Sequence, residues 1–413
     1  MSHRFASINV VIINDFAHVQ GGAAKVAIES AIGLAEAGHR VFFIYGDGPA
    51  SEALFHPNIQ LIDLEEQELL NNPSRFLAAR EGLWNRRVAS RVAEVLRGLS
   101  AEHTVVHLHS WVKVLSPSVI HAIRRAGLPL VTTLHDYFSV CPNGGFYNYR
   151  TQSTCPLRPL SAACLATNCD ARSYPQKIWR SARQFLTSMA GMPRHQRHFI
   201  YVSEFSRRVV EPYLPKAANL WHVPNPIKAN KEEPVLPSRS TTMSFIGRLT
   251  PEKGGDVFVE AARLTGIHAK LVGAGSMQDT LEARLPDAQF TGWQPHAAVI
   301  DHMKTSRCVV LSSRIYETQG MVVAEAAAYG VPSIVSSDCA GSEFIEDGVT
   351  GLLFRSGDIN DLAEKMRRLA NDDALVNRLG KQAYARFWEA DLTAQRHVDN
   401  LMTCYRHMLA TQR

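Results

Sequence analysis

Short apolar runs alternate along the chain with segments of helical periodicity. Ile8–Ile13 is a run rich in β-branched residues, as expected for a strand that is buried on both faces. Ala23–Glu36 carries apolar residues at helical spacing and is followed by Gly38, and Val41–Tyr45 is the next apolar run. This strand–helix–strand pattern predicts a parallel sheet that is covered by helices on both faces.

The same alternation continues through the first half of the chain and begins again in the second. In the first half, further strands are predicted over Thr104–His109, Leu130–Leu134, Ile200–Val202 and Leu220–Val223, and a helix over Ser116–Ala126. In the second half, the predicted strands are Met243–Ile246, Ala269–Val272, Gln289–Thr291, Val309–Leu311 and Pro332–Val335, and the predicted helices are Gly255–Leu264, Met321–Tyr329 and a stretch from about Asp358. A linker rich in proline and charge, 224–240, separates the two series.

Two such series predict an α/β protein with two Rossmann-like, doubly wound domains that face each other across a cleft. We expect the first domain over 1–224, the second over 225–390, and a C-terminal helix, 391–413, that packs back on the first domain. Because ligands of such sheets bind beyond the carboxyl ends of the strands, the chemistry is expected in the cleft.

Composition limits where the protein works. Of the 413 residues, 46% are hydrophobic and 20% are charged. The longest apolar runs are strand-sized, far short of the roughly 20 residues of a membrane helix. Asn14 and Asp15 interrupt the first apolar stretch, so the sequence predicts no signal peptide and a cytoplasmic location.

The charge is uneven between the two halves. Lysine and arginine exceed aspartate and glutamate by 8 over 1–228 and fall short by 3 over the rest, which makes the net charge of +5. A basic first half predicts an anionic partner, such as a membrane surface or a diphosphate-linked acceptor, unless the charges only form solvated helix faces. No nucleic acid is expected as a partner, because no nucleic-acid-binding motif accompanies the charge.

A glycine and two cations follow the first predicted strand of the second domain. In Gly247-Arg248-Leu249-Thr-Pro-Glu-Lys253-Gly254, the glycine lets a ligand approach the backbone, and the two cations lie five residues apart. Arginine binds phosphate oxygens in pairs, whereas lysine acts as a point charge, so together they can neutralise a diphosphate. Fixed cations there would stabilise the charge that builds on a departing phosphate.

Two carboxylates and a helix start lie further along this domain. Glu317 falls in a strand-to-helix loop, and Gly320 precedes a helix whose unpaired N–H groups and positive dipole end can seat a phosphate. Glu325 follows Glu317 by eight residues, about two helical turns. One carboxylate can therefore contact a sugar while the other contacts the ribose of the same nucleotide.

These motifs together resemble the donor-binding half of the retaining glycosyltransferase family 4, which has the GT-B fold. The resemblance is carried by Gly247-Arg248-Leu249 with Lys253-Gly254, by Val272-Gly273-Ala274-Gly275, and by Glu317-x7-Glu325. Looser similarity continues in the first domain, in Gln20-Gly21-Gly22, Thr133-Leu134-His135-Asp136-Tyr137 and Val202-Ser203-Glu204. It therefore extends over nearly the whole chain.

The resemblance implies a role for each matching residue. Residues implied as catalytic are Arg248 and Lys253 on the donor diphosphate, Glu317 on the transferred sugar, and His135 near the reacting sugar carbon. Residues implied as donor-binding are Gly320, Met321 and Val322 at the phosphate, Glu325 at the ribose, Gly273 and Trp293 near the base, and Gly22 in a loop that closes over the donor. Membership would also imply retention of anomeric configuration and no cofactor for catalysis, with a departing phosphate oxygen taking the proton of the acceptor hydroxyl. The implied acceptor is a lipid-linked or surface-polysaccharide saccharide, reached peripherally at the inner face of the membrane.

Cysteine and histidine patterns raise a separate question of metal binding. Cys141, Cys155, Cys164 and Cys169 fall in an insertion near 138–175, where a structural zinc, free thiols and disulfides are the alternatives. His107 and His109 lie two apart on one strand face and are expected to be core or cleft-lining histidines rather than metal ligands.

Other functions remain open at this stage. Another GT-B enzyme, a glycoside phosphorylase or a nucleotide-sugar epimerase, is the first alternative. A nicotinamide-dependent reductase is disfavoured, because neither glycine-rich loop has the spacing G-x-G-x-x-G. A non-catalytic binding module would be expected to lose Lys253 or Glu317, and this chain keeps both.

Overall fold

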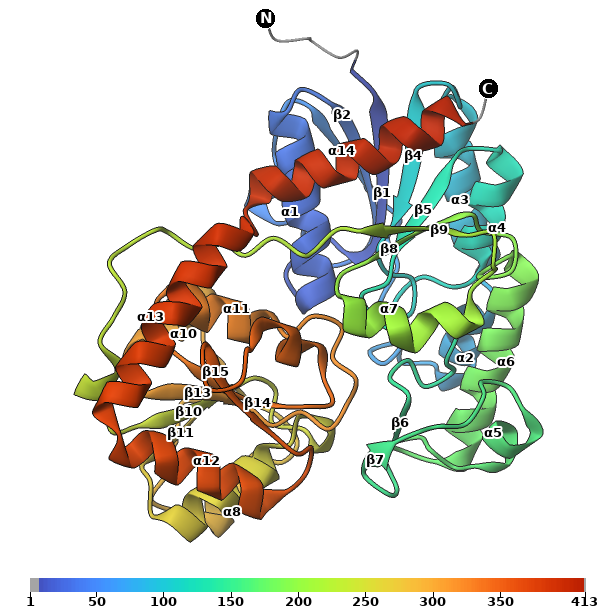
Figure 1. Ribbon diagram of the computed structural model, residues 1–413. Coiled ribbons are helices and arrows are strands. Elements are labelled where there is room, and N and C mark those ends of the chain that lie inside the picture. The colour runs from blue at the N-terminus through green and yellow to red at the C-terminus, as the bar shows by residue number, and fades with distance from the viewer. Residues whose placement is uncertain (1–6, 412–413) are drawn as a thin grey trace, which may run out of the picture. The chain divides into compact units, whose positions relative to one another are not determined.

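The computed structural model describes residues 7–411, which form two compact units (Figure 1). Unit 1 comprises 1–144, 157–226 and 394–413, and unit 2 comprises 145–156 and 227–393. The chain passes between the units after 226 and after 393, whereas the sequence analysis placed its boundaries after 224 and after 390. Residues 145–156 differ, because the sequence analysis placed the whole insertion in the first domain.

Unit 1 is built on a seven-stranded parallel sheet with the strand order β3-β2-β1-β4-β5-β8-β9. Its strands are β1 (Asn9–Phe16), β2 (Arg40–Asp47), β3 (Ile59–Asp63), β4 (Thr104–Leu108), β5 (Leu130–Thr133), β8 (His198–Tyr201) and β9 (Asn219–His222). Its helices are α1 (Gly22–Glu36), α2 (Arg75–Leu83), α3 (Arg86–Arg97), α4 (Ser118–Ala126), α5 (Ala162–Ala166), α6 (Tyr174–Ala190), α7 (Glu204–Val210) and α14 (Ala394–Ala410), with 3-10 turns η1 (Glu52–Leu54) and η2 (Glu211–Tyr213).

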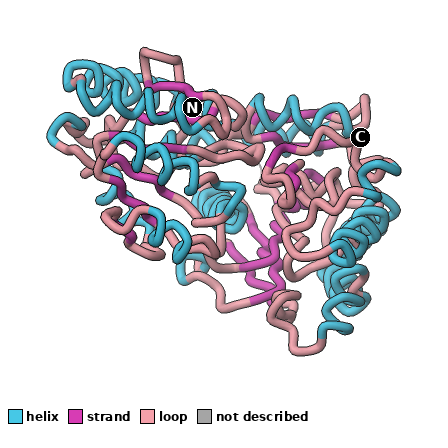
Figure 2. The backbone as a smooth tube through the Cα atoms, turned by 90° about the horizontal axis from the view of Figure 1, so that it is seen from below, coloured by secondary structure: helices cyan, strands magenta, loops and turns pink. Residues whose placement is uncertain are grey.

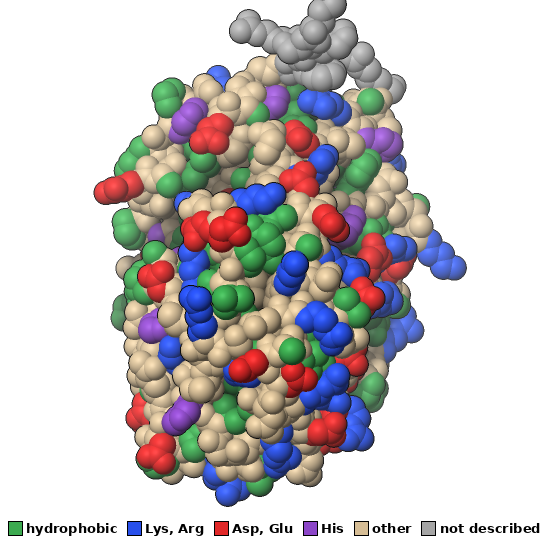
Figure 3. All heavy atoms as spheres, turned by 60° about the vertical axis from the view of Figure 1, so that its left-hand side comes forward, with side chains coloured by type: hydrophobic (Ala, Val, Ile, Leu, Met, Phe, Trp, Pro, Cys, Tyr) green, Lys and Arg blue, Asp and Glu red, His purple; other side chains and the backbone are tan. Residues whose placement is uncertain are grey.

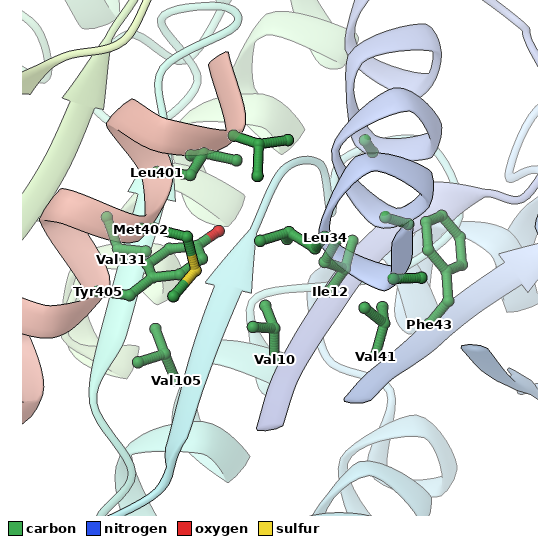
Figure 4. Close-up of a cluster of buried hydrophobic side chains, with 14 of the residues drawn as sticks. Val10, Ile12, Leu34, Val41, Phe43, Val105, Val131, Leu401, Met402 and Tyr405 are labelled. Atoms are coloured by element: carbon green, nitrogen blue, oxygen red, sulfur yellow. The ribbon is translucent and has the colours of Figure 1, made fainter. Parts of the chain in front are cut away.

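Strand β1 of unit 1 is buried on both faces, which explains its continuous apolar sequence. Val10 and Ile12 pack into one cluster with α1 and the C-terminal helix α14, as Figure 4 shows. Val11 and Ile13 belong to a second cluster with α3 and α4 on the opposite face. Helix α14 thus completes the core of unit 1, where it packs beside α1 (Figure 1).

Unit 2 contains a six-stranded parallel sheet with the order β12-β11-β10-β13-β14-β15. Its strands are β10 (Met243–Ile246), β11 (Ala269–Val272), β12 (Gln289–Phe290), β13 (Cys308–Leu311), β14 (Ser333–Ser336) and β15 (Gly351–Phe354). Its helices are α8 (Gly255–Thr265), α9 (Gln278–Arg284), α10 (His296–Lys304), α11 (Met321–Ala328), α12 (Ile359–Asn371) and α13 (Asp373–Ala390), with 3-10 turns η3 (Pro237–Arg239), η4 (Pro251–Lys253) and η5 (Ala340–Phe344). Helices cover both faces of its sheet. Figure 2 shows the helices in cyan and the strands in magenta.

A two-stranded hairpin, β6 (Tyr147–Asn148) and β7 (Ser153–Thr154), carries residues 145–156 into unit 2. Tyr147 is 1% exposed. At the hairpin turn, Gln152 accepts a hydrogen bond of 3.5 Å from Arg314, which also forms two 2.9 Å bonds to the carboxylate of Asp256. The buried ring of Tyr147 and the hydrogen bond from Arg314 explain why the hairpin belongs to unit 2.

Candidate active site

The loops after β10, β11 and β13 meet at the carboxyl edge of the sheet in unit 2. Gly254 has φ 70°, and a Cβ there would clash with the carbonyl oxygen of Ser312 after β13. Gly273 has φ 140°, and a Cβ there would clash with the carbonyl oxygen of Gly247 after β10. Glycine is therefore required at both positions for the three loops to touch.

Lys253 and Glu317 form an ion pair where these loops meet. Lys253 Nζ lies 2.6 Å from Glu317 Oε1, and Ser313 donates to the same carboxylate at 2.9 Å. Burial alone would raise the pKa of Glu317, but the charge and hydrogen bond of Lys253, the Ser313 hydroxyl and the charge of Arg248 lower the pKa on balance. Glu317 is thus held as an anion beside a fixed cation.

Arg248 extends from the same loop with 71% of its side chain exposed. Its nearest recorded carboxylate is Glu252 Oε1 at 3.7 Å, a loose ion pair, whereas the Glu252 side chain is only 7% exposed. The Glu252 carbonyl accepts from the backbone N–H of Arg314. Because its own guanidinium is exposed and this ion pair is loose, Arg248 can turn toward an anion, while Glu252 joins the β10 and β13 loops.

Helix α11 begins beside this ion pair. Gly320 occupies its N-cap with φ 72°, and glycine has no side chain of its own to cap the helix start. The backbone N–H groups of Met321 and Val322 lie in the first turn, where helices bind anions. Glu325, one turn further on, is 7% exposed, and His296 Nε2 lies 3.9 Å from its carboxylate.

The loops after β11 and β12 carry the residues that are expected near the nucleotide base. Gly273 forms an isolated bridge with Gly292, so the loop after β11 meets the end of β12. Trp293 follows and is 77% exposed, a large ring surface open to solvent. Unit 2 thus brings together Arg248, Lys253, Gly273, Glu317, Gly320, Met321, Val322 and Glu325 near one sheet edge, with Trp293 at the margin.

A chain of buried histidines runs through unit 1 to His135. His107 hydrogen-bonds Tyr405 of α14 and Thr133, each at 2.7 Å, and its ring contacts that of His109 in a tilted arrangement with centroids 4.0 Å apart. His109 Nδ1 lies 2.9 Å from His135 Nε2. Burial, followed by the charge of His397, lowers the pKa of His135 to about 3, so its ring is neutral near pH 7.

The hydrogen bonding of His109 favours one tautomer of this pair. No described residue reaches the buried Nε2 of His109. An unfilled lone pair at Nε2 is less costly than an unpaired N–H, so the proton belongs on Nδ1 of His109. His109 then donates to Nε2 of His135, which leaves the Nδ1–H of His135 as its donor.

Unit 1 also fixes the loop after β4, which lies beside the start of α1. The Asp15 carboxylate, fully buried at the end of β1, accepts five hydrogen bonds of 2.6–3.0 Å from Ser110 and from the backbone of residues 112–115. Arg183 of α6 donates to three carbonyls of residues 111–115 from the other side. Gly22 begins α1 and is exposed, next to Gly21 at φ 145°.

Of the three alternatives for the cysteine insertion, a structural zinc is not supported. Among residues 7–411, no group of three or more histidine, cysteine or acidic side chains could hold a metal ion. Lys177 is 1% exposed, and its Nζ lies 3.3 Å from Cys164 Sγ. A zinc ion bound by thiolates would therefore lie close to a buried positive charge. Cys141, Cys155, Cys164 and Cys169 are free thiols. His107 is a core histidine, as predicted.

Two contributors to the site were missed by the sequence analysis. Glu252 and Ser313 join the β10 loop to Glu317, the first as a buried spacer and the second as a hydrogen-bond donor. Ser313 could have been found, because Ser312 and Ser313 follow directly after an apolar strand at its carboxyl end. Glu252 carried no such signal, since glutamate in a polar loop is ordinarily solvated.

The fold and this site define a two-domain α/β protein of the GT-B class. A solved structure of HepE from Anabaena in complex with UDP and glucose is similar, with a TM-score of 0.68 and 17% identity, covering 97% of this chain and 100% of that chain. At this identity the likeness shows the fold alone.

The sequence then identifies the family. The profile described as Glycosyltransferase Family 4 matches residues 20–231, more than half of the chain, and the profile described as Glycosyl transferases group 1 matches residues 226–386. The chain therefore belongs to glycosyltransferase family 4, as its motifs predicted.

Curated relatives match over part of their length. An uncharacterized glycosyltransferase of Methanocaldococcus jannaschii is 30% identical over 142 residues, which are 33% of this chain and 40% of that protein. The poly(ribitol-phosphate) α-N-acetylglucosaminyltransferase of Staphylococcus aureus is 27% identical over 180 residues, which are 40% of this chain and 35% of that protein. The chain thus aligns with well under half the length of both relatives.

Proposed function

We propose that this protein is a retaining glycosyltransferase that moves a sugar from a nucleoside-diphosphate sugar to an acceptor hydroxyl. The observation that carries the proposal is the pairing of Lys253 with Glu317, beside Arg248 and the glycine N-cap of α11. Two cations and the positive end of a helix dipole are the groups that bind phosphate oxygens. A structurally similar protein, HepE, has been solved with UDP and glucose, which supports the same donor chemistry.

In this mechanism, the charged groups act on the departing diphosphate. Arg248, Lys253 and the N–H groups of Met321 and Val322 bind its oxygens and stabilise the negative charge as the sugar–oxygen bond breaks. Glu317 contacts hydroxyls of the transferred sugar, and Glu325 contacts the ribose. The departing phosphate oxygen takes the proton of the acceptor hydroxyl as the new bond forms on the same face of the sugar.

His135 contributes a neutral hydrogen-bond donor in this proposal. Its pKa of about 3 keeps the ring uncharged at neutral pH. A neutral imidazole can donate to a sugar hydroxyl without adding a positive charge that would oppose an electron-deficient sugar carbon. In the tautomer that His109 favours, His135 carries its proton on Nδ1, and this N–H is the donor we propose.

The acceptor is proposed to be a saccharide on a lipid carrier or a surface polysaccharide, with the enzyme acting peripherally at the inner face of an anionic membrane. The basic first half of the chain and the named substrate of the Staphylococcus relative, poly(ribitol-phosphate), support an anionic acceptor. None of the helices within residues 7–411 has the length and apolarity needed to cross a membrane.

Donor screening followed by product analysis tests the proposal. Thermal unfolding is measured with a panel of nucleoside-diphosphate sugars, and the donor that stabilises the chain most is then incubated with saccharide acceptors. We expect release of nucleoside diphosphate and a product whose anomeric configuration, determined by NMR, matches that of the donor. Formation of a sugar phosphate only with inorganic phosphate would identify a phosphorylase, and interconversion of two nucleotide sugars without acceptor would identify an epimerase.

A further inference from the structure

Helix α6 of unit 1 has its polarity reversed relative to an ordinary surface helix. Its buried residues are mostly polar or charged: Lys177, Ser181, Arg183, Gln184, Thr187 and Ala190. These side chains find internal partners. Arg183 donates to backbone carbonyls of residues 111–115, Gln184 to the carbonyl of Ser139, and Lys177 to Cys164. The helix is therefore anchored to unit 1 by hydrogen bonds rather than by an apolar stripe.

The outward face of α6 is apolar along its whole length. Every residue of this fully described helix in the exposed class is apolar or aromatic: Tyr174, Pro175, Ile178, Ala182, Phe185 and Met189. The large side chains are 40% exposed at Tyr174, 44% at Ile178, 59% at Phe185 and 63% at Met189. Their spacing of three, four and seven residues places them on one stripe of a helix about 25 Å long. Single exposed apolar residues are ordinary, but a continuous row marks an interaction surface.

Basic residues lie beyond both ends of this helix. The sequence contains no aspartate or glutamate from Ala171 to Ser203, and the exposed Arg172 and Arg194 lie shortly before and after α6 in the chain. Helix α4, which packs against α6, ends in the exposed Arg124 and Arg125. On the face drawn in Figure 3, by contrast, acidic and basic side chains are intermixed.

We infer that the outward face of α6 binds the surface of an anionic lipid bilayer, with Ile178, Phe185 and Met189 inserted among the acyl chains and Arg172 and Arg194 on the head groups. An apolar stripe flanked by cations is the pattern of helices that lie in the membrane interface. A second copy of the chain fits the surface less well, because a twofold contact would bring the two sets of arginines together. This inference rests on the membrane association proposed above and names the surface responsible for it. Because vesicle binding is measured without a sugar donor, a failure to bind vesicles and a failure to transfer sugar are separate results.

Vesicle sedimentation of the full chain tests this inference. Vesicles of phosphatidylcholine alone are compared with vesicles that also contain phosphatidylglycerol, at low and high salt. We expect binding to the anionic vesicles that weakens with salt. The double variant Phe185→Ser/Met189→Ser should bind at least tenfold more weakly, because both side chains lose their transfer into the acyl region. The variant Phe55→Ser removes a residue that is 70% exposed elsewhere in unit 1 and should bind like the unchanged protein.

A second set of variants separates charge from apolar contact. Arg172→Gln and Arg194→Gln should each weaken binding to anionic vesicles about fivefold and reduce its salt dependence. The inference is overturned if the unchanged chain stays in the supernatant with anionic vesicles, or if Phe55→Ser weakens binding as much as the α6 double variant. It is also overturned if sedimentation velocity without lipid shows a dimer that the double variant abolishes, since the face would then bind a second copy.

Discussion

Replacing Lys253 with alanine is the sharpest test of the diphosphate site. Lys253 Nζ is 2.6 Å from Glu317 Oε1, and the two side chains are 21% and 17% exposed. The charge is therefore fixed by a partner before any donor binds, in a place that water reaches only partly. The substitution removes this cation and leaves Glu317 with Ser313 as its remaining close donor, so the pKa of Glu317 should rise toward its usual range.

The effect should fall mainly on turnover. Loss of one preorganised donor at a site where charge develops costs roughly 10²–10³ in kcat, about 2.7–4 kcal/mol of transition-state stabilisation. Lys253 is asked to bind a diphosphate whose charge grows as the sugar leaves, so kcat should fall more than KM rises. Arg248→Gln should also lower kcat/KM. Because Arg248 is only loosely paired before the donor binds, more of its effect should appear as an increase in KM.

Lys304 supplies a matched control in the same unit. Its Nζ also lies 2.6 Å from a carboxylate oxygen, that of Glu232, at similar lysine exposure, but outside the site. Lys304→Ala should change stability by no more than about 1 kcal/mol and leave turnover intact. The assay is release of nucleoside diphosphate from the donor that screening identifies. Equal kcat in Lys253→Ala and the unchanged enzyme, with the fold preserved, would refute the assigned role.

Three further predictions concern backbone, loop and pH. Gly320→Ala should lower stability by about 1–2 kcal/mol and weaken UDP binding, because φ is 72° and a Cβ would press on Gly341; calorimetry measures both. Asp15→Asn should cost about 3 kcal/mol in denaturant unfolding, because an amide cannot accept all five bonds. Burial lowers the pKa of His397 to about 4. Between pH 6.5 and 4 the unfolded chain therefore binds more protons than the folded one, and the free energy of unfolding decreases as pH falls. Between pH 7 and 5 the free energy of unfolding of His397→Gln should therefore fall by about 2 kcal/mol less than that of the unchanged protein. The control His103→Gln, at an exposed position, should behave like the unchanged protein.

Local pattern was sufficient to predict most strands of the two sheets and the sheet edge at which Arg248, Lys253 and Glu317 lie. Strands such as β1 and β10 are short apolar runs bounded by polar loops, and their carboxyl ends carry the functional residues because parallel sheets collect their loops there. Arg248, Lys253 and Glu317 could therefore be assigned before their contacts were known. Glycines at 254 and 273 appear in the sequence only as small residues, and the loop contacts that require them follow from the fold.

Contacts between distant segments could not be predicted. The ring of His107 meets Tyr405, nearly 300 residues away, and the hairpin at 145–156 packs with unit 2 through Arg314. Neither has a periodic signal, since each depends on which elements the topology brings together. The cysteine insertion could not be settled from sequence between zinc, free thiols and disulfides. The fold decides against zinc, because no group among residues 7–411 could hold a metal ion and a buried lysine lies beside Cys164.

Helix α6 was also missed, although its apolar residues recur at helical spacing. That spacing predicts a helix but does not show which way the apolar stripe faces, and the fold places it outward. Polar anchoring costs stability that an apolar face would have supplied, since Arg183 must be desolvated before it can bind the loop at 111–115, and burial lowers its pKa to about 10. Natural sequences depart from local consistency chiefly at functional sites. If the outward stripe had no partner, replacing Phe185 and Met189 with serine should raise solubility at no functional cost; if it binds a membrane, the same change should release the enzyme from anionic vesicles while donor hydrolysis in solution stays unchanged.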